Sequence, residues 1–265
     1  MSLITLLTDF GTTDYFVGAM KGAILSVNPQ AHIVDLTHDI PAHDIEAGAF
    51  TLCAAYEAFP AHTIHLAVVD PGVGSTRRPI LVASGAHCFV GPDNGLFGYV
   101  CAREAPVRVY HLTGREFFRA AVSATFHGRD IFAPVAAALS QGASPEEFGE
   151  LIDDYVRLDR PAPQRDADET LRAAIIHIDR FGNCITNITG RDLSSEQLAR
   201  GATLEIGGRQ INSMRQFYAD ETGAAGELFA IWGSAGFLEI AANCASAARL
   251  LDARRGQLVR VSNLS

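Results

Sequence analysis

The chain has 265 residues, of which 48% are hydrophobic and 19% are charged, as in a globular protein with one large domain or two smaller ones. Its net charge of −9 and the absence of a Lys/Arg-rich run argue against nucleic acid as a partner. No apolar run is long enough for a membrane span and residues 1–7 lack the features of a signal peptide, so we expect a soluble cytoplasmic enzyme.

The first 140 residues alternate between strand and helix patterns. Residues 3–8 predict a buried strand, and residues 32–36 predict a second strand. A helix pattern follows each strand, with apolar residues recurring at helical spacing at Val17, Met20, Ile24 and Val27, then at Ile45, Ala49, Leu52 and Tyr56. Further strands are expected at residues 63–70, 79–84, 87–90 and 108–112, with an Ala-rich helix ending at Ser140. This alternation predicts an α/β domain with a substantially parallel central sheet.

The segment TIHLAVVD, residues 63–70, runs from apolar residues into an aspartate, and Pro-Gly ends the strand directly after it. Asp70 is therefore expected at the carboxyl end of a buried strand, where open α/β sheets bind their ligands. Arg77 follows a flexible loop and can reach the Asp70 carboxylate. A structural ion pair that closes the loop explains the spacing equally well.

Two other polar residues stand at loop positions before helices. Asp9 follows the first strand, at the same sheet edge as Asp70, and a carboxylate there can accept hydrogen bonds from ligand hydroxyls. Thr12, Thr13 or Asp14 is expected to cap the first helix. His127 precedes the Ala-rich helix, where an imidazole can hold a water molecule, cap the helix or form a buried hydrogen bond.

Metal binding has weak support in the sequence. His38 and His43, next to Asp39 and Asp44, lack the spacing of a helical metal motif, and turn or capping roles are favoured. The five cysteines are widely spaced without a CxxC pair, which indicates neither a zinc site nor a disulfide framework.

The composition changes after the first domain, expected at residues 1–160. Residues 161–171 are rich in proline and charge, which is typical of a linker. From residue 172 to 265 the pattern is mostly strands and turns, which predicts a small β domain, either a sandwich or a barrel. Its two notable loops are DRFGN, residues 179–183, and WGSAG, residues 232–236.

Several motifs occur in the order found in one known family: LLTDFGTTDYFVGAMKG, VVDPGVGSTRR, GPDNG, TFHGRDIFAPVAA, DRFGN and GSAGFLEIAAN. Through them nearly the whole chain resembles the S-adenosyl-L-methionine (SAM) hydrolases, also called SAM hydroxide adenosyltransferases, which are relatives of fluorinase and chlorinase. The resemblance implies an N-terminal α/β domain, a C-terminal β-barrel domain, and a homotrimer that binds SAM between neighbouring subunits. It implies no cofactor, because SAM is the substrate.

The resemblance also implies roles for residues of the first domain. Asp70, Arg77 and His127 match the set that holds the attacking water or hydroxide. Asp9 matches the ligand of the ribose diol, and Asp14 matches a contact to the methionine amine.

In the second domain, Asn183 matches an adenine contact with Phe181 nearby, and Ser234 matches a contact to the methionine carboxylate. Asp179 is carried over as a further substrate-binding residue, although its loop is shorter than in the halogenases.

Three positions differ from the halogenases. Gly128 stands where they have serine, Asp70 where they have tyrosine, and Ala235 where they have arginine. These differences argue against halide as the nucleophile and leave the partner of the methionine carboxylate open.

The implied reaction is hydrolysis of SAM to adenosine and L-methionine by in-line attack at ribose C5′. A sulfonium leaves as a neutral thioether, so the reaction needs a held nucleophile and a fixed sugar but no general acid. Two alternatives remain: a metal-dependent phosphatase or nucleotidase with Asp9, Asp14 and His127 as ligands, and a noncatalytic protein that binds SAM or adenosine.

Overall fold

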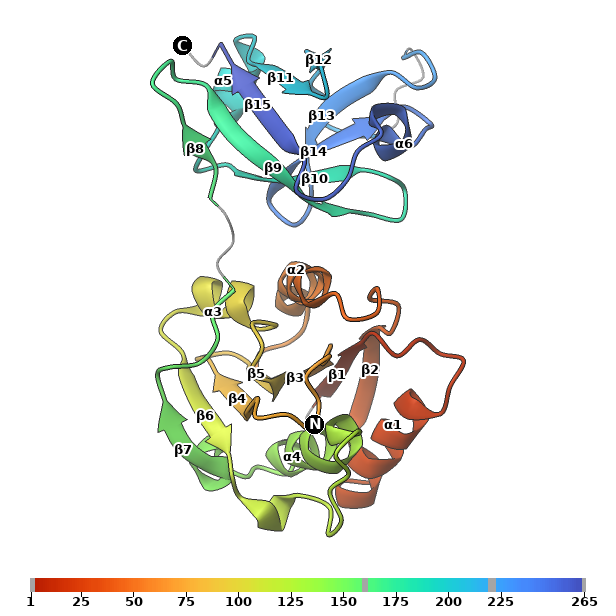
Figure 1. Cartoon of the computed structure of the whole chain (residues 1–265), viewed down its shortest axis with the longest axis vertical. Coiled ribbons are helices and arrows are strands. Elements are labelled where there is room, and N and C mark those ends of the chain that lie inside the picture. The colour runs from red at the N-terminus through yellow and green to blue at the C-terminus, as the bar shows by residue number, and fades with distance from the viewer. Residues whose placement is uncertain (1–2, 159–161, 219–222, 264–265) are drawn as a thin grey trace. The chain divides into compact units, whose positions relative to one another are not determined.

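The computed structural model describes residues 3–158, 162–218 and 223–263. The chain folds into two compact units, Met1–Asp159 and Arg160–Ser265 (Figure 1). No helix within the described ranges is long and apolar enough to cross a membrane.

The first unit is built on a seven-stranded sheet with the strand order β2-β1-β3-β5-β4-β6-β7. The strands are β1 (Leu3–Thr8), β2 (His32–Thr37), β3 (Ile64–Val68), β4 (Pro79–Ala83), β5 (Cys88–Pro92), β6 (Arg108–Leu112) and β7 (Gly149–Ile152). Strands β2, β1, β3 and β5 are parallel, whereas β4, β6 and β7 pair antiparallel with their neighbours. The predicted α/β class is confirmed, and the short turn at Gly85 and Ala86 explains why β4 and β5 form a hairpin instead of a parallel pair.

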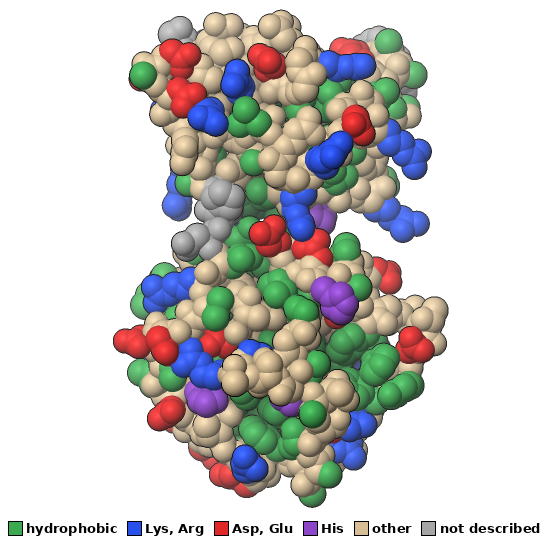
Figure 2. Space-filling view, in the orientation of Figure 1, with side chains coloured by type: hydrophobic (Ala, Val, Ile, Leu, Met, Phe, Trp, Pro, Cys, Tyr) green, Lys and Arg blue, Asp and Glu red, His purple; other side chains and the backbone are tan. Residues whose placement is uncertain are grey.

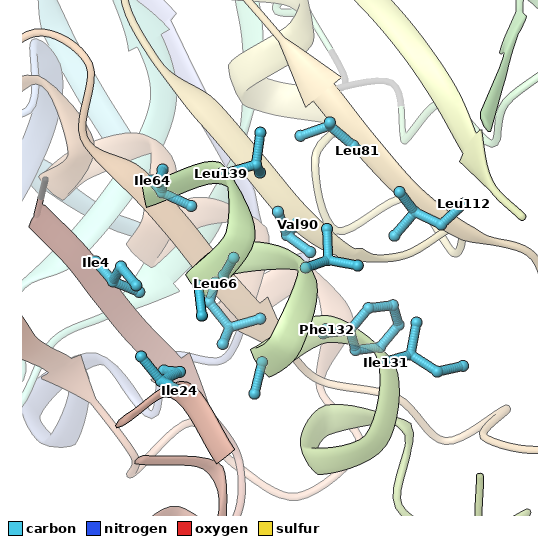
Figure 3. Packing of buried hydrophobic residues seen from close by; sticks show 14 of the residues in the cluster. Ile4, Ile24, Ile64, Leu66, Leu81, Val90, Leu112, Ile131, Phe132 and Leu139 are labelled. Atoms are coloured by element: carbon cyan, nitrogen blue, oxygen red, sulfur yellow. The ribbon is translucent and has the colours of Figure 1, made fainter. Parts of the chain in front are cut away.

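Helices cover both faces of this sheet. They are α1 (Phe16–Val27), α2 (Ile45–Ala55), α3 (Gly98–Glu104) and α4 (Ala133–Ser140), with 3-10 turns at Tyr56–Ala58, Arg115–Phe117 and Pro145–Phe148 and a π-helical turn at Gly128–Phe132. Ile24 of α1, Leu139 of α4 and Leu66 of β3 belong to one buried cluster on one face of the sheet (Figure 3). Leu52 of α2 and Val100 of α3 belong to the cluster on the other face. Strands buried on both faces explain the continuous apolar runs in the sequence.

The predicted cap of α1 is wrong. The residue before the helix is Tyr15, and its N-cap makes no side-chain hydrogen bond. Thr12, Thr13 and Asp14 are exposed in the loop, which turns once more before the helix begins at Phe16. In α2, by contrast, the Asp44 carboxylate accepts a hydrogen bond from the Ala47 amide at 3.0 Å. The Asp14 carboxylate is therefore not used by the fold in the way that its spacing suggested.

A buried pair of histidines, His65 and His87, lies near the other end of β3. His65 Nδ1 lies 2.8 Å from Thr5 Oγ1, and its Nε2 lies 3.3 Å from His87 Nδ1. Burial, followed by the charge of His87, lowers the pKa of His65 to about 3. Unfolding at acid pH therefore takes up a proton at this residue, because the unfolded side chain has its ordinary pKa.

We expect the free energy of unfolding to fall as the pH drops below about 6.5 and to keep falling toward pH 3, with His65 contributing up to about 1.4 kcal/mol per pH unit. Urea unfolding at several pH values measures this slope. His65→Gln should make the slope shallower, whereas the same change at His32, which is exposed, should leave it unaltered. An unchanged slope in His65→Gln would contradict the assignment.

The second unit is a nearly closed antiparallel sheet with the strand order β12-β11-β15-β9-β10-β14-β13, and β8 pairs with β9. Its elements are β8 (Gln164–Arg165), β9 (Leu171–Ile178), β10 (Cys184–Thr189), α5 (Ser195–Ala199), β11 (Thr203–Ile206), β12 (Arg209–Ile211), β13 (Leu228–Trp232), β14 (Phe237–Ala242), α6 (Ala247–Leu251) and β15 (Leu258–Ser262). An isolated bridge between Met214 and Ala230 brings the chain after β12 to β13 at the other end of the strand order. Of the two predicted forms, the barrel is therefore confirmed.

The barrel has a core of its own. Residues Leu204, Leu238, Ile240 and Val259, from β11, β14 and β15, are buried together in it. The predicted linker, residues 161–171, begins at a residue outside the described ranges and includes β8, which pairs with β9. Part of this proline-rich stretch thus adds an edge to the barrel sheet.

Candidate active site

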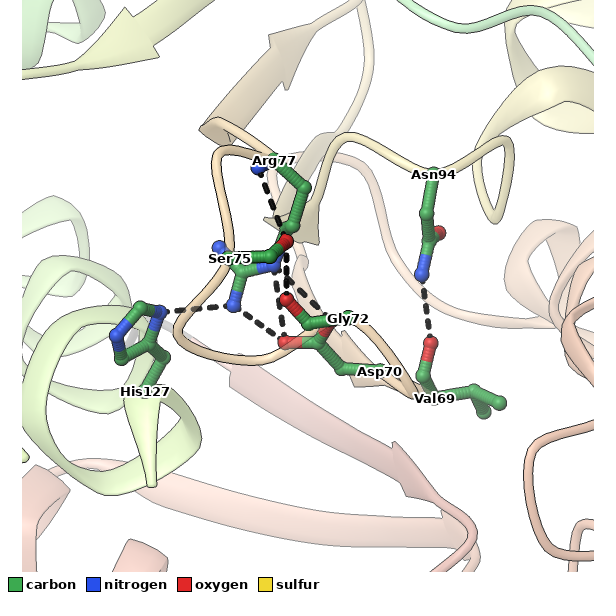
Figure 4. Close-up of polar contacts among 7 residues, drawn as sticks. All are labelled: Val69, Asp70, Gly72, Ser75, Arg77, Asn94 and His127. Atoms are coloured by element: carbon green, nitrogen blue, oxygen red, sulfur yellow. Dashed lines mark hydrogen bonds and ion pairs between the residues drawn. The ribbon is translucent and has the colours of Figure 1, made fainter. Parts of the chain in front are cut away.

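Asp70 and Arg77 form a buried ion pair beyond the carboxyl end of β3. Arg77 Nε donates to Asp70 Oδ1 at 3.0 Å and to Oδ2 at 3.1 Å, and Arg77 Nη2 also donates to Oδ2 (Figure 4). The side chains of Asp70 and Arg77 are only 4% and 8% exposed. The predicted position of Asp70 and its predicted contact with Arg77 are both found in the structure. A charge pair this buried has to be well bonded, because each partner alone would be costly in the interior.

The loop between them is shaped by glycine and by Ser75. Ser75 Oγ donates to the Gly72 carbonyl at 2.7 Å and accepts a hydrogen bond from the Arg77 amide at 3.2 Å. Gly74 has a φ of +77°, a backbone conformation that favours glycine. On the other side of Asp70, Asn94 Nδ2 donates to the Val69 carbonyl at 2.8 Å, which braces the strand end (Figure 4). The loop is thus a fixed support for the ion pair.

His127 joins the pair from a distant part of the chain. Arg77 Nη2 donates to His127 Nδ1 at 2.8 Å. A guanidinium can only donate, so Nδ1 must be the acceptor, and neutral His127 carries its proton on Nε2. Burial, followed by the positive charge of Arg77, lowers the pKa of His127. The imidazole therefore stays neutral and offers an N–H donor on the side away from Arg77.

A π-helical turn presents His127. The turn begins at Gly128, directly after the histidine, and the Ala133 amide donates to the Gly128 carbonyl five residues back. The ring of Phe132, at the end of the same turn, lies 5.2 Å from the Arg77 guanidinium carbon. The π-helical turn and the histidine directly before it therefore supply two neighbours of Arg77, and π-helical turns frequently occur at functional sites. His127 makes no side-chain cap, so the capping alternative is wrong for this residue.

Asp9 lies at the same edge of the sheet, because Thr8 of β1 pairs in parallel with Val68 of β3. Asp9 Oδ2 accepts a hydrogen bond from the His43 amide at 2.8 Å, which uses one of its two carboxylate oxygens. Asp14 is exposed in the loop before α1. Within the described parts of the chain, no hydrogen bond joins Asp9 or Asp14 to the Asp70, Arg77 and His127 group.

His38 and His43 occupy turn positions, as their sequence context favours. His38 Nδ1 lies 2.9 Å from Thr8 Oγ1, and the His43 backbone has a φ of +68° that directs its amide to Asp9. Across the residues that the structure places, there is no group of three or more His, Cys, Asp or Glu side chains arranged to hold a metal ion.

In the second unit, Asp179 holds the DRFGN loop together. Its Oδ1 accepts hydrogen bonds from the amides of Phe181 and Asn183 at 2.9 and 2.8 Å, and its Oδ2 accepts one from Asn183 Nδ2 at 2.9 Å. Asn183 is buried, whereas the Phe181 ring is 77% exposed. The carboxylate thus fixes the amide group of Asn183, with Nδ2 turned toward Asp179.

Ser234 lies exposed in the turn between β13 and β14. The turn is closed by hydrogen bonds from the Gly233 amide to the Phe237 carbonyl at 2.9 Å and from the Gly236 amide to the Gly233 carbonyl at 3.0 Å. Ala235, in the same turn, adds no polar group.

Two residues of the barrel form a contact that was not predicted from the sequence. Glu239 is buried in β14, and the Tyr218 hydroxyl donates to its Oε2 at 2.7 Å. The signal in the sequence was the single charge in the apolar strand FLEIAA. Nothing in the sequence near Tyr218 indicates its partner.

The two units together define a class of protein: an α/β sheet with a buried Asp–Arg–His group beyond its parallel strand ends, followed by a small antiparallel barrel. A model of the SAM hydroxide adenosyltransferase N-terminal domain matches residues 4–149, and one of the C-terminal domain matches residues 173–260. The chain belongs to the SAM hydroxide adenosyltransferase family.

Individual relatives agree. The chain is 40% identical over 262 residues to the (R)-S-adenosyl-L-methionine hydrolase of Salinispora tropica, a match that covers 98% of this chain and 97% of that protein. It is 28% identical to the fluorinase of Nocardia brasiliensis, covering 98% and 96% of the two chains. The crystal structure of an uncharacterized conserved protein from Thermotoga maritima superposes with a TM-score of 0.87 at 32% identity, covering 97% of this chain and 99% of that one.

Proposed function

We propose that this protein hydrolyses SAM to adenosine and L-methionine. The observation that carries the proposal is the direct contact of Asp70, Arg77 and His127 in a chain that is similar to a SAM hydrolase over nearly its whole length. In the reaction, an oxygen of water or hydroxide forms a bond to ribose C5′ while the C5′–S bond breaks. The electron pair of that bond goes to sulfur, which leaves as the neutral thioether of methionine.

In this proposal, the nucleophile is held by Asp70, Arg77 and His127. Arg77 donates hydrogen bonds to both Asp70 and His127 Nδ1. The Nε2–H group of His127 is therefore left to donate a hydrogen bond to the oxygen of the nucleophile. A neutral imidazole that donates a hydrogen bond cannot accept the proton of water at the same nitrogen. The group therefore orients the oxygen and favours hydroxide electrostatically, and the proton passes to solvent.

Two substitutions of His127 test this role. His127→Gln supplies a carbonyl that can accept from Arg77 and an amide that can donate to the nucleophile, so we expect it to keep the rate within about tenfold of the wild type. His127→Ala loses both bonds and should slow adenosine release by about a hundredfold. Single-turnover rates with SAM make the comparison. Equal rates for the two variants would contradict a donor role for the imidazole.

The remaining site residues bind the substrate in this proposal. Asp9 accepts hydrogen bonds from the ribose diol through the oxygen that does not bind His43, and Asp14 contacts the methionine amine. Asn183 and the exposed ring of Phe181 bind adenine, and Ser234 binds the methionine carboxylate. Asp179 supports this half of the site through Asn183, because its carboxylate is already occupied by that loop.

The protein also acts as a homotrimer in the cytoplasm under this proposal, with two domains at residues 1–160 and 172–265 and sites shared between subunits. Exposed apolar side chains on the first unit support an interface with another copy; Tyr15 is 68% and Val122 is 45% exposed. Figure 2 shows hydrophobic side chains gathered on one face of this unit. Light scattering coupled to size-exclusion chromatography should give three times the chain mass of 28.4 kDa.

Incubation of the purified protein with SAM and chromatographic detection of adenosine test the function itself. We expect adenosine and methionine in equal amounts, and the same rate with a chelator present because the proposal needs no cofactor. Loss of activity with the chelator and recovery with Mg²⁺ or Mn²⁺ would support the metal-dependent alternative. Tight binding of SAM without adenosine release over hours would support a noncatalytic role.

A further inference from the structure

Glu239 is a buried carboxylate to which the proposed function gives no task. It lies on β14 opposite Ile185 of β10 and Ile231 of β13, and the residue is only 7% exposed. Its neighbours along the strand, Leu238 and Ile240, belong to the barrel core, so Glu239 faces the other side of the sheet. Burial raises the pKa of Glu239, against the hydrogen bond from Tyr218, which lowers it. Burying a carboxyl costs the fold free energy, and the single hydrogen bond from Tyr218 offsets only part of that cost.

The contacts of Glu239 connect separate parts of the barrel. The Tyr218 hydroxyl donates to Oε2 at 2.7 Å, and the Tyr218 ring packs edge-on against Phe229 with centroids 6.4 Å apart. On the other side, a Cβ placed on Gly233 would overlap Glu239 Oε1, so the carboxyl lies directly against the turn that carries Ser234. Strand β10, whose Ile185 pairs with Glu239, begins at Cys184 directly after the DRFGN loop, so this loop enters the sheet beside Glu239.

A buried carboxylate bonded to one half-exposed tyrosine contributes little to stability, since the desolvation penalty offsets the hydrogen bond. It does, however, contact the Ser234 turn and lie close to the loop of Asn183. We propose that Glu239 is a positioning residue for SAM binding, which holds Tyr218 and the Gly233 turn so that the loops for adenine and methionine keep their places. This inference rests on the proposed function of those loops.

The test compares Glu239→Gln, Tyr218→Phe and the double variant. Each single change should raise KM for SAM by about tenfold, as for the loss of one hydrogen bond to a charged group, and leave kcat within about twofold. The double variant should show no further rise, because both changes break the same bond. The melting temperature of Glu239→Gln should equal or exceed that of the wild type, a result that a purely structural role for the carboxylate would not give.

Tyr110→Phe is the matched control, since the Tyr110 hydroxyl donates to Glu146 Oε1 at 2.9 Å within the first unit. It should leave KM unchanged. A wild-type KM in Glu239→Gln would overturn the inference, as would additive effects in the double variant. If Glu239→Gln fails to fold, a wild-type KM in Tyr218→Phe overturns it.

The proposal of SAM hydrolysis and the inference about Glu239 can be tested separately. If the wild-type protein releases no adenosine from SAM, hydrolysis is wrong, and calorimetric Kd values for SAM decide the role of Glu239. A Kd raised by about tenfold in Glu239→Gln supports the positioning role, and an unchanged Kd overturns it.

Discussion

Asp70→Ala is expected to slow adenosine release from SAM by on the order of a thousandfold or more, because it removes the anchor of the group that holds the nucleophile. It should also lower the free energy of unfolding by about 3–5 kcal/mol, since Arg77 would stay buried without its counter-charge. The pair is almost fully buried, with Asp70 4% and Arg77 8% exposed, so solvent cannot replace the lost carboxylate. Adenosine assays and urea unfolding measure the two effects.

Asp70→Asn separates the effect on activity from the effect on stability. It keeps a carbonyl that can accept one hydrogen bond from Arg77, so part of the stability should return while activity stays low. Asp35→Asn is the control, because Asp35 pairs with Lys21 at 2.6 Å but both side chains are more than a third exposed, and the asparagine carbonyl can still accept from His38 Nε2, which lies 3.1 Å from the carboxylate. An exposed pair contributes about 1 kcal/mol or less, so this variant should behave like the wild type. Activity in Asp70→Ala within tenfold of the wild type would refute the assignment of the group.

Gly74→Ala should be the second most damaging substitution. The residue has a φ of +77°, and a Cβ there would overlap the carbonyl oxygen of Ala124. The added methyl group therefore meets backbone atoms and a strained conformation together, for which we expect a loss of about 2 kcal/mol or more in unfolding free energy. Arg77 follows three residues later, so kcat should also fall as the loop shifts.

Gly72→Ala is the matched control within the same loop. A Cβ at Gly72 would lie 3.5 Å from both Arg77 Cγ and Ser75 Oγ, which is ordinary contact distance. We expect this variant to retain its stability and most of its activity. If both alanine variants behave alike in urea unfolding and in adenosine assays, the conformation of Gly74 does not control the loop.

The sequence was informative where the relevant contacts are local. Strand β3 and the position of Asp70 follow from an apolar run that ends in Pro-Gly, and Arg77 is only seven residues away. The predicted cap of α1 was wrong because Thr12, Thr13 and Asp14 are all acceptable caps by residue type. Nothing in the local sequence shows that the loop continues to Tyr15.

Contacts between residues far apart in the sequence could not be derived from residue spacing. His127 is 50 residues from Arg77, and their hydrogen bond depends on how the turn before α4 packs beside β3. Family resemblance had grouped these residues, but the protonated nitrogen of His127 follows only from the direction of the Arg77 bond. Glu239 was missed for a related reason: its partner, Tyr218, lies 21 residues earlier in a segment without a regular pattern.

The π-helical turn that follows His127 makes the alignment of the imidazole depend on chain length. Such a turn accommodates one residue more than an α-helical turn would, and successive helical residues are about 100° apart around the axis. Deleting a single residue between Gly128 and Phe132 would let the helix continue regularly and swing the imidazole away from Arg77. This turn should therefore tolerate conservative replacements better than insertions or deletions.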